Sequence, residues 1–331
     1  MRALTIVQPH QAEVQEIERP EAEGRDVLIE VKTCGICGTD VHILHGEYMG
    51  FYPIIPGHEF AGVVRAVGVD VSRVSVGDRV AVEPNIACDN CFACLHNRQN
   101  FCYNWEAVGV TRPGGMAQYV VAPEKTVFGI DDLSFETGAF MEPLSCVIHG
   151  VERAEVQLAD RVAIVGAGPI GLLLLQVIRQ QGAASITVAE RQPARLELAA
   201  SFGADRVVAS ADELGRDAYD VVVDATGAVG VMSRTLTWVR RGGTILLFGV
   251  PPRDTRLTLD AFSFFEKGVT VRSSFTSVRN SYQALGLLRS GKVEVDPLIS
   301  HRLSLEAFER GVRLIEEGRE AVKKVLLLPN G

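Results

Sequence analysis

The stretch VAIVGAGPIG, residues 162–171, decides the fold of this 331-residue chain. Its first four residues, 162–165, form an apolar run typical of a buried strand, and an apolar stretch of helical length follows the turn. The glycines between them fit G-x-G-x-x-G, which in this strand–turn–helix setting predicts a dinucleotide-binding turn. Gly166 permits the tight turn, Gly168 lets the backbone approach a pyrophosphate, and Gly171 allows close helix–strand packing.

The next predicted strand ends at Glu190, where an acidic side chain is expected to bond the adenosine ribose hydroxyls. Its charge would repel a 2′-phosphate, which favours NAD over NADP. Arg191 argues the other way, because an arginine there is able to pair with such a phosphate. The alternative interpretation is that the glycines serve only a tight turn and that Glu190 is a solvated strand end.

Around this stretch, strands and helices alternate from about residue 160. The predicted strands are 186–189, 219–224, 244–248 and 269–273, and the predicted helices are 194–202, 231–239 and 281–290. This alternation implies right-handed parallel crossovers and therefore an α/β fold with a doubly wound sheet.

The N-terminal part, residues 1–145, is predicted to be β-rich. Its short apolar runs, at 3–7, 27–32, 61–67 and 79–82, are separated by Gly, Pro and Asp turn signals, which indicates a barrel or sandwich. The last forty residues hold a predicted helix at 305–317 and a strand at 324–328. Because no helix follows that strand, it is a candidate to return to the N-terminal domain. The predicted domains are 1–145 with 292–331, and 146–291.

Composition excludes several classes of protein. The chain is 47% hydrophobic and 22% charged, with a formal net charge of -8 and no Lys/Arg cluster, which argues against nucleic acid or an anionic membrane as partner. No apolar run reaches membrane-spanning length. The opening MRALTIVQ has no apolar signal segment, so we expect a cytoplasmic protein.

Four of the seven cysteines lie close together, in the pattern Cys88-x2-Cys91-x2-Cys94-x7-Cys102. Tetrahedral Zn²⁺ needs four ligands brought together by short turns, and this spacing supplies four thiolates. A site filled entirely by protein ligands is closed, so we predict a structural zinc. The alternatives are an Fe–S cluster, which also takes four cysteines, or unligated thiols.

A second constellation is spread over the N-terminal part, at Cys37, His58, Glu59 and Glu142. Each residue alone is a weak signal, and Cys34-x2-Cys37 also fits a redox-active pair. Together, and upstream of a dinucleotide turn, they suggest an open catalytic zinc site with mixed sulfur, nitrogen and oxygen ligands.

With these motifs in place, the chain resembles the zinc-containing medium-chain alcohol dehydrogenases, in particular their sorbitol/polyol and threonine dehydrogenase branch. The motifs that carry the resemblance are GICGTDVH (35–42), GHEFAG (57–62), VGDRV (76–80), the four-cysteine segment, GG-x-AQY (114–119), EPLS (142–145) and GAGPIG (166–171). The resemblance implies a GroES-like catalytic domain formed by both chain ends, a Rossmann cofactor domain, and an active site in the cleft between them.

The resemblance also implies roles for the second constellation. Cys37 and His58 correspond to catalytic zinc ligands, and Glu59 to the acidic residue that either binds zinc or stands just behind it. Glu142 occupies the place where classical alcohol dehydrogenases have a second cysteine, which makes the site similar to that of a polyol dehydrogenase. Whether Glu59, Glu142 or a water completes the sphere stays open.

In the cofactor domain, Arg195 matches the family's adenosine-ribose contact. Residues that correspond to the lining of the nicotinamide end are Ile170, Thr226, Val250, Ser274 and Phe275. In the implied mechanism, zinc acts as a Lewis acid on the substrate hydroxyl, Thr39 accepts the proton, and the cofactor ribose passes it to His42. Without the motif, Thr39 would be interpreted as a turn-capping hydroxyl and His42 as a structural histidine.

We therefore predict a zinc-dependent oxidoreductase that transfers hydride from a secondary alcohol, preferably a polyol, to NAD. The enzyme alternatives are a polyol-phosphate or threonine-like amino-alcohol dehydrogenase. An alternative of another class is a catalytically silent, zinc-stabilised nucleotide sensor or a zinc-free reductase relative. The resemblance also implies a homo-dimer or homo-tetramer, assembled through cofactor-domain sheet edges near residues 269–273.

Overall fold

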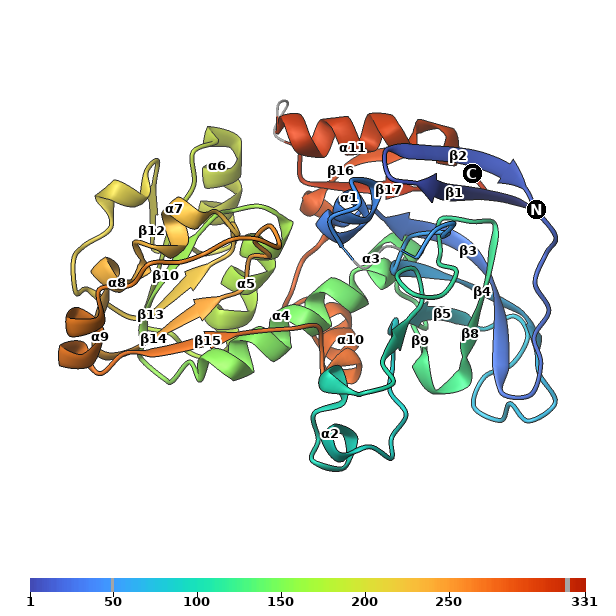
Figure 1. Cartoon of the computed structure of the whole chain (residues 1–331), viewed down its shortest axis with the longest axis horizontal. Helices are drawn as coiled ribbons and strands as arrows, with labels where there is room; N and C mark the ends of the chain where they lie inside the picture. Colours follow the sequence, from blue (N-terminus) through green and yellow to red (C-terminus); the bar gives the residue numbers. More distant parts are fainter. Residues whose placement is uncertain (49–50, 319–321) are drawn as a thin grey trace. The chain divides into compact units, whose positions relative to one another are not determined.

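The computed structural model describes residues 1–48, 51–318 and 322–331, and the chain divides into two units (Figure 1). The first comprises Met1–Ser145 and Val278–Gly331, and the second comprises Cys146–Ser277.

The boundary near the C-terminus thus lies before helix α10 (Ser281–Arg289), whereas the sequence analysis predicted it after this helix. The Ser281 hydroxyl donates to Glu83 (2.9 Å) and the Arg289 guanidinium donates to the Gly129 carbonyl (2.8 Å), so α10 is bonded to the first unit.

The first unit is built on strands that, among the described residues, pair antiparallel except for one parallel pair near the C-terminus. In the described residues, seven of them form one sheet in the order β16-β17-β3-β4-β5-β9, with β8 paired to β3. Their bounds are β3 Asp26–Gly35, β4 Glu59–Val67, β5 Arg79–Val82, β8 Tyr119–Pro123, β9 Val127–Gly129, β16 Ile299–Leu303 and β17 Lys324–Leu327. The short pairs are β1 Arg2–Gln8 with β2 Gln11–Glu16, and β6 Asn85–Ile86 with β7 Glu106–Ala107. The helices are α1 Gly38–Leu44, α2 Phe92–Leu95, α3 Phe135–Ala139, α10 and α11 Phe308–Glu317, while α4 Met141–Ala154 runs across the boundary of the units.

The predicted return of the last strand is confirmed. β17 pairs antiparallel with β3, with Leu326 opposite Gly35 and Leu327 opposite Cys34. Side chains from both ends of the chain, including Ile6, Phe60 and Phe308, are fully buried in one apolar core. Burial of this kind contributes roughly 25 cal/mol per Å² of apolar surface, which holds the distant segments together.

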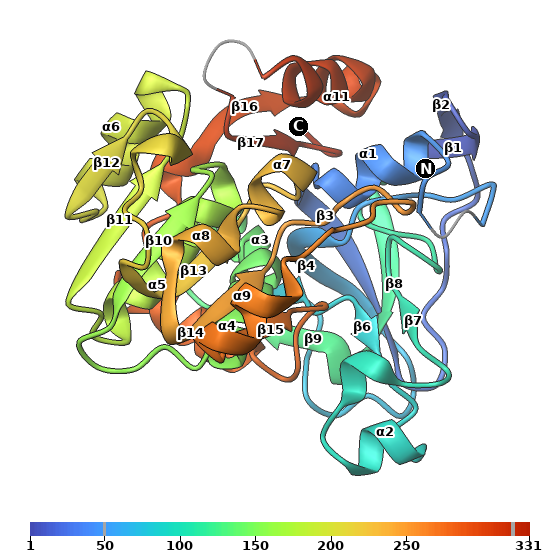
Figure 2. The same cartoon turned by 60° about the vertical axis from the view of Figure 1, so that its left-hand side comes forward.

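The second unit is a six-stranded parallel sheet in the order β12-β11-β10-β13-β14-β15 (Figure 2). The strands are β10 Arg161–Val165, β11 Ser185–Ala189, β12 Arg206–Val208, β13 Tyr219–Asp224, β14 Val239–Leu247 and β15 Thr270–Ser273. The connecting helices are α5 Pro169–Gln180, α6 Pro193–Ser201, α7 Val229–Met232, α8 Thr235–Trp238 and α9 Ala261–Lys267. In order along the chain this is 3-2-1-4-5-6, the strand order of dinucleotide-binding folds. The predicted doubly wound sheet is confirmed.

Two predicted helices differ in detail. The helix expected at 231–239 is two short helices, α7 and α8, and it ends at Trp238 because the buried Val239 pairs with Tyr219 as the first residue of β14. The helix expected from residue 305 begins at Phe308, after a 3₁₀ turn at Leu305–Ala307. In the described residues, no helix combines the length and apolarity needed to span a membrane.

Candidate metal centres and dinucleotide turn

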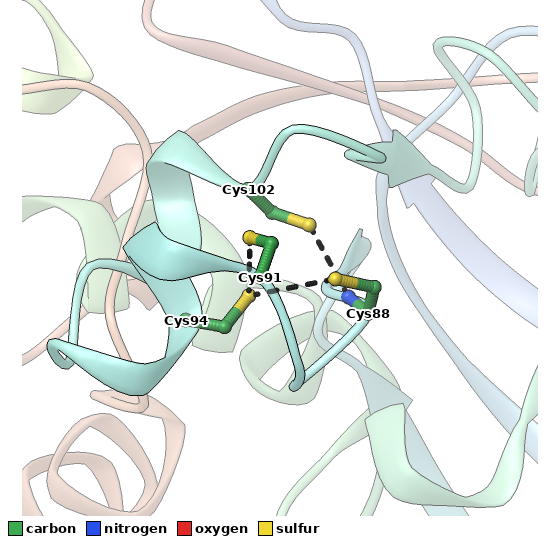
Figure 3. A group of neighbouring side chains, drawn as sticks. All are labelled: Cys88, Cys91, Cys94 and Cys102. Atoms are coloured by element: carbon green, nitrogen blue, oxygen red, sulfur yellow. Dashed lines mark hydrogen bonds between the residues drawn. The ribbon is translucent and has the colours of Figure 1, made fainter.

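The four cysteines of the predicted closed site lie together in the loop around α2 (Figure 3). Cys91 is the N-cap of α2 and Cys94 lies within it, so one helical turn brings their sulfurs to 3.5 Å. The Cys88 and Cys94 sulfurs are 4.0 Å apart, and all four sulfurs lie within 4.8 Å of one another. Around zinc, a Zn–S bond of about 2.3 Å places tetrahedral sulfurs about 3.8 Å apart, so the cluster fits this ion.

The pKa values of two thiols in this cluster are shifted in opposite directions. Backbone N–H groups of Cys94 and Tyr103 lower the pKa of Cys91 to about 6, whereas burial raises the pKa of Cys94 to about 12. Four thiolates side by side repel one another, and a divalent cation removes this repulsion because it binds sulfur in its deprotonated form. All seven cysteines of the chain are free, so no disulfide competes for these sulfurs.

The second constellation forms where β3 runs into α1. Cys37 is the N-cap of α1, and the pairing of Gly35 with Glu59 brings the start of β4 beside it. The ligand atoms of Cys37, His58 and Glu59 lie within 4.8 Å of one another, with His58 and Glu59 buried. Glu142, at the start of α4, is buried but is not a member of this group in the part of the chain that the structure describes. Three ligands of mixed type leave one tetrahedral position open, as in catalytic zinc sites.

The proposed relay residues both lie on α1. Thr39 follows the N-cap Cys37 by two residues, and it is therefore not the capping residue of this helix. His42 lies in the last turn, with its side chain 28% exposed. The candidate ligand Cys37, the Thr39 hydroxyl and the partly solvated His42 ring thus follow one another along one short helix and its N-cap.

The glycines of the predicted dinucleotide turn have the geometry that the motif requires. Gly166 has a φ of +100°, and a Cβ on Gly171 would lie 1.9 Å from the Gly166 carbonyl oxygen. A Cβ on Gly168 would meet no atom within 4 Å, so the space over the turn is open to a ligand. Gly168 is also the N-cap of α5, where unpaired N–H groups and the positive end of the helix dipole attract phosphate.

Glu190 is fixed against this turn by three backbone N–H groups. Its carboxylate accepts from Ala167 (2.9 Å), Arg191 (2.8 Å) and Gln192 (3.0 Å). The Arg195 guanidinium lies 3.9 Å from the same carboxylate. The negative charge therefore has a defined place beside the turn, because both carboxylate oxygens accept hydrogen bonds from the backbone.

The remaining predicted cofactor residues follow the carboxyl ends of parallel strands, where ligands of such sheets bind. Ile170 lies in the first turn of α5 after β10, Thr226 follows β13, Val250 follows β14, and Ser274 and Phe275 follow β15. The Thr226 hydroxyl donates to Asp224 (2.6 Å), and burial raises the pKa of that carboxyl. The Ser274 hydroxyl is buried and finds no hydrogen-bond partner among the described residues. This arrangement leaves a donor available to a ligand at that edge of the sheet.

Known proteins match both units. The alcohol dehydrogenase GroES-like domain family matches residues 23–132, and the zinc-binding dehydrogenase family matches residues 169–290. D-arabinitol dehydrogenase 1 of Uromyces fabae is 33% identical over 94% of this chain and 93% of its own length. The chain belongs to the zinc-binding alcohol dehydrogenases.

Other similarities refine this placement of the dehydrogenase. D-altritol 5-dehydrogenase of Agrobacterium fabrum is 35% identical over 92% of this chain and 93% of its own length. A crystal structure of a zinc-binding dehydrogenase from Sinorhizobium meliloti bound to NADP has a TM-score of 0.95 at 33% identity, covering 99% of both chains. Relatives include both polyol and L-threonine dehydrogenases, which confirms the predicted branch.

Sequence reasoning missed Asp40, although it lies within a quoted motif of the dehydrogenase. Asp40 is fully buried and accepts from the N–H groups of Cys37 (2.8 Å) and Gly57 (3.2 Å), so it connects the two segments that carry the candidate metal ligands. Its carboxylate lies 3.6 Å from Nδ1 of His58. Burial alone would lower the pKa of His58, but the charges of Asp40 and Cys37 outweigh it and raise this pKa well above its usual value. The site therefore favours a cation.

Sequence reasoning also missed Lys324, a buried lysine in the last strand of the dehydrogenase. Its ammonium forms an ion pair with Glu59, and a Cβ on Gly35 would lie 2.3 Å from the Glu59 carboxylate and 2.7 Å from the lysine side chain. Burial lowers the pKa of Lys324, but the charges of Glu59 and Cys37 reverse this and raise it above its usual value. In the sequence Lys324 is the second of two adjacent lysines at the start of an apolar strand, a pattern that is also typical of a solvated strand end.

Proposed function

We propose that this dehydrogenase oxidises a secondary hydroxyl of a polyol to a ketone and delivers the hydride to NAD. The observation that carries the proposal is the open group of Cys37, His58 and Glu59 within a chain that also holds a complete dinucleotide turn. The similarity to D-arabinitol and D-altritol dehydrogenases supports a polyol as substrate.

We propose Cys37, His58 and Glu59 as the ligands of the catalytic zinc, and the four cysteines around α2 as those of a structural zinc. Bound at the open group, zinc would polarise an alcohol oxygen as a Lewis acid. Asp40 keeps the segments of Cys37 and His58 in register, and Lys324 balances the charge of Glu59. Glu142 stands outside the group of ligand atoms, so Glu59 is the better third ligand of the described residues.

The proton of the alcohol needs a route to water, and α1 supplies one. In our proposal Thr39 accepts it and His42 carries it outward, since a histidine exchanges protons near neutral pH. Thr39 lies one helical turn or less from His42, on the helix that Cys37 begins. Replacement of Thr39 by alanine with zinc still bound tests the first step, and near-normal turnover would contradict it.

The cofactor preference is proposed to depend on the charge of Glu190. Glu190→Gln keeps the side-chain length and one of the two oxygen acceptors but removes the charge that repels a 2′-phosphate. We expect the ratio of kcat/KM for NAD over NADP to fall by about tenfold, the effect of one charged hydrogen bond. Steady-state kinetics with both cofactors measures this, with Glu197→Gln on the exposed face of α6 as control. A wild-type enzyme that works only with NADP would contradict the proposal.

The substrate class is tested by a panel of polyols, polyol phosphates and amino alcohols with NAD and NADP. Polyol oxidation with the highest kcat/KM supports the proposal. Preference for a polyol phosphate or for threonine would instead support a polyol-phosphate dehydrogenase or a threonine-like amino-alcohol dehydrogenase. If every alcohol is inert although two zinc ions are bound, the silent nucleotide sensor is the better description.

We further propose a homo-oligomer that forms through the free edge of the second unit's sheet. β15 has a neighbour on one side only, and an unpaired strand edge invites pairing with a second copy. Exposed apolar side chains accompany this edge, namely Phe262 and Phe265 on α9 and Val271 on β15. We expect Val271→Asp to shift the mass in solution, measured by light scattering, towards the monomer. Val207→Asp on the opposite edge strand β12 is the matched control, and an effect of equal size there would contradict this interface.

We also propose that the protein works in the cytoplasm. Its seven cysteines are all free, and thiolate metal sites suit a reducing compartment. Fractionation of cells that express the tagged chain tests this location.

A further inference from the structure

Two separate groups of histidines and carboxylates lie near the C-terminal end of α1. Nδ1 of His42 lies 2.7 Å from a carboxylate oxygen of Glu47. Close by, Nε2 of His45 lies 2.5 Å from a carboxylate oxygen of Glu316 on α11, and its Nδ1 lies 3.1 Å from Nδ1 of His10 in the turn between β1 and β2. Of the two carboxylate–histidine pairs, only the first includes the residue proposed to carry the substrate proton.

The backbone holds Glu47 in this position. Its N–H donates to the carbonyl of His42 (2.9 Å), so the chain folds back over the end of α1. Gly46 makes the reversal with a φ of +75°, a conformation that L side chains rarely adopt. The segment His42–Glu47 is therefore a preformed turn that returns the carboxylate to the imidazole.

An ionised carboxylate only accepts hydrogen bonds, and a neutral imidazole has one N–H. The contact with Glu47 thus assigns the N–H of His42 to Nδ1 and leaves Nε2 as a proton acceptor. When Nε2 takes a proton, the positive ring remains beside a negative charge.

We infer that Glu47 is a positioning residue for proton release, which fixes the tautomer of His42 and stabilises its protonated ring. The inference rests on the proposed function, because it assigns Glu47 a part in the route from Thr39 to water. The proton moves from the incoming donor to Nε2 of His42 and then from the ring to solvent, and Glu47 itself is not protonated.

The charges around this pair are consistent with an ionised Glu47. The hydrogen bond from His42 lowers the pKa of Glu47, and the nearby rings of His45 and His10 act in the same direction. Glu316 faces His45, and Asp40 on α1 is buried among the N–H groups of Cys37 and Gly57. Among the described residues, no other carboxylate is hydrogen-bonded to His42, so no second carboxylate is in place to orient its ring when Glu47 is replaced.

The test compares Glu47→Gln with Glu316→Gln in the full-length, zinc-loaded enzyme. Gln removes the charge at each carboxylate–histidine pair, but only Glu47 faces the relay. We expect Glu47→Gln to lower kcat about tenfold near neutral pH and to shift the acidic limb of the kcat profile, with Glu47→Asp and added imidazole restoring part of the rate. Glu316→Gln should leave the profile within about twofold of wild type.

A second readout is independent of turnover. Nitrogen-15 NMR of labelled histidine should find the neutral His42 ring protonated at Nδ1 in the wild type and as a mixture of tautomers in Glu47→Gln. An unchanged tautomer, or an unchanged kcat profile in an enzyme that His42→Ala slows, would overturn the role of Glu47 and leave the relay intact. If His42→Ala also leaves the profile unchanged, both the relay and the inference are wrong.

Discussion

Replacing His58 with asparagine should remove one of two zinc ions per chain and reduce turnover by about a thousandfold or more. The buried ring of His58 is one of three candidate ligands, and a metal held by Cys37 and Glu59 alone would be weakly bound. Because Glu59 is already paired with Lys324, its carboxylate does not compensate for the missing nitrogen. Elemental analysis of the purified chain and steady-state kinetics measure the two effects.

The control for this experiment is His149→Asn. His149 is half-buried on α4 in the second unit and belongs to neither group of candidate metal ligands in the described residues, so zinc content and turnover should stay unchanged. Full activity of His58→Asn with a single zinc would show that the catalytic centre lies elsewhere. Retention of two zinc ions would show that His58 is not a ligand.

The second large effect concerns stability. Cys94→Ser should release the other zinc, because the Cys94 sulfur lies 4.0 Å from that of Cys88 and 3.5 Å from that of Cys91 and is buried within α2. Structural zinc contributes on the order of 10 kcal/mol to the folding of small domains. Loss of even a third of this would lower Tm by roughly 10 °C in a chain of this size. Differential scanning calorimetry with parallel zinc analysis measures the change.

Cys146→Ser is the matched control, since Cys146 belongs to neither group of ligands in the described residues. We expect its Tm and zinc content to equal those of the wild type. If Cys94→Ser keeps both zinc ions and its Tm, the four sulfurs are not a structural metal site.

Local patterns made much of this structure predictable. The glycines at 166, 168 and 171 and the apolar run before them specify a strand, a turn and a helix within a single short segment. The four cysteines around α2 likewise lie close in sequence, so their spacing already determines that their sulfurs can meet. In both cases the chemistry depends on neighbours along the chain.

The features that were missed depend on pairing between distant segments. Lys324 reaches Glu59 only because β17 pairs with β3 and β3 pairs with β4, and no periodicity in the sequence reports such a register. The helix predicted at 231–239 likewise extended one residue too far, because the pairing of Val239 with Tyr219 of β13 is not visible in the local pattern.

The contacts between the two ends of the chain also determine the order in which the parts of the structure can fold during synthesis. The side chain of Asn330 donates to the carbonyl of Val31, which lies 299 residues earlier. During synthesis, Cys37, His58 and Glu59 therefore leave the ribosome long before the lysine that balances their charge, whereas the second unit is continuous and has all its strands within one segment. Contacts between distant residues form late in folding. The candidate catalytic metal centre is consequently completed only after Lys324 has been synthesised, when the whole sequence of the second unit is already available.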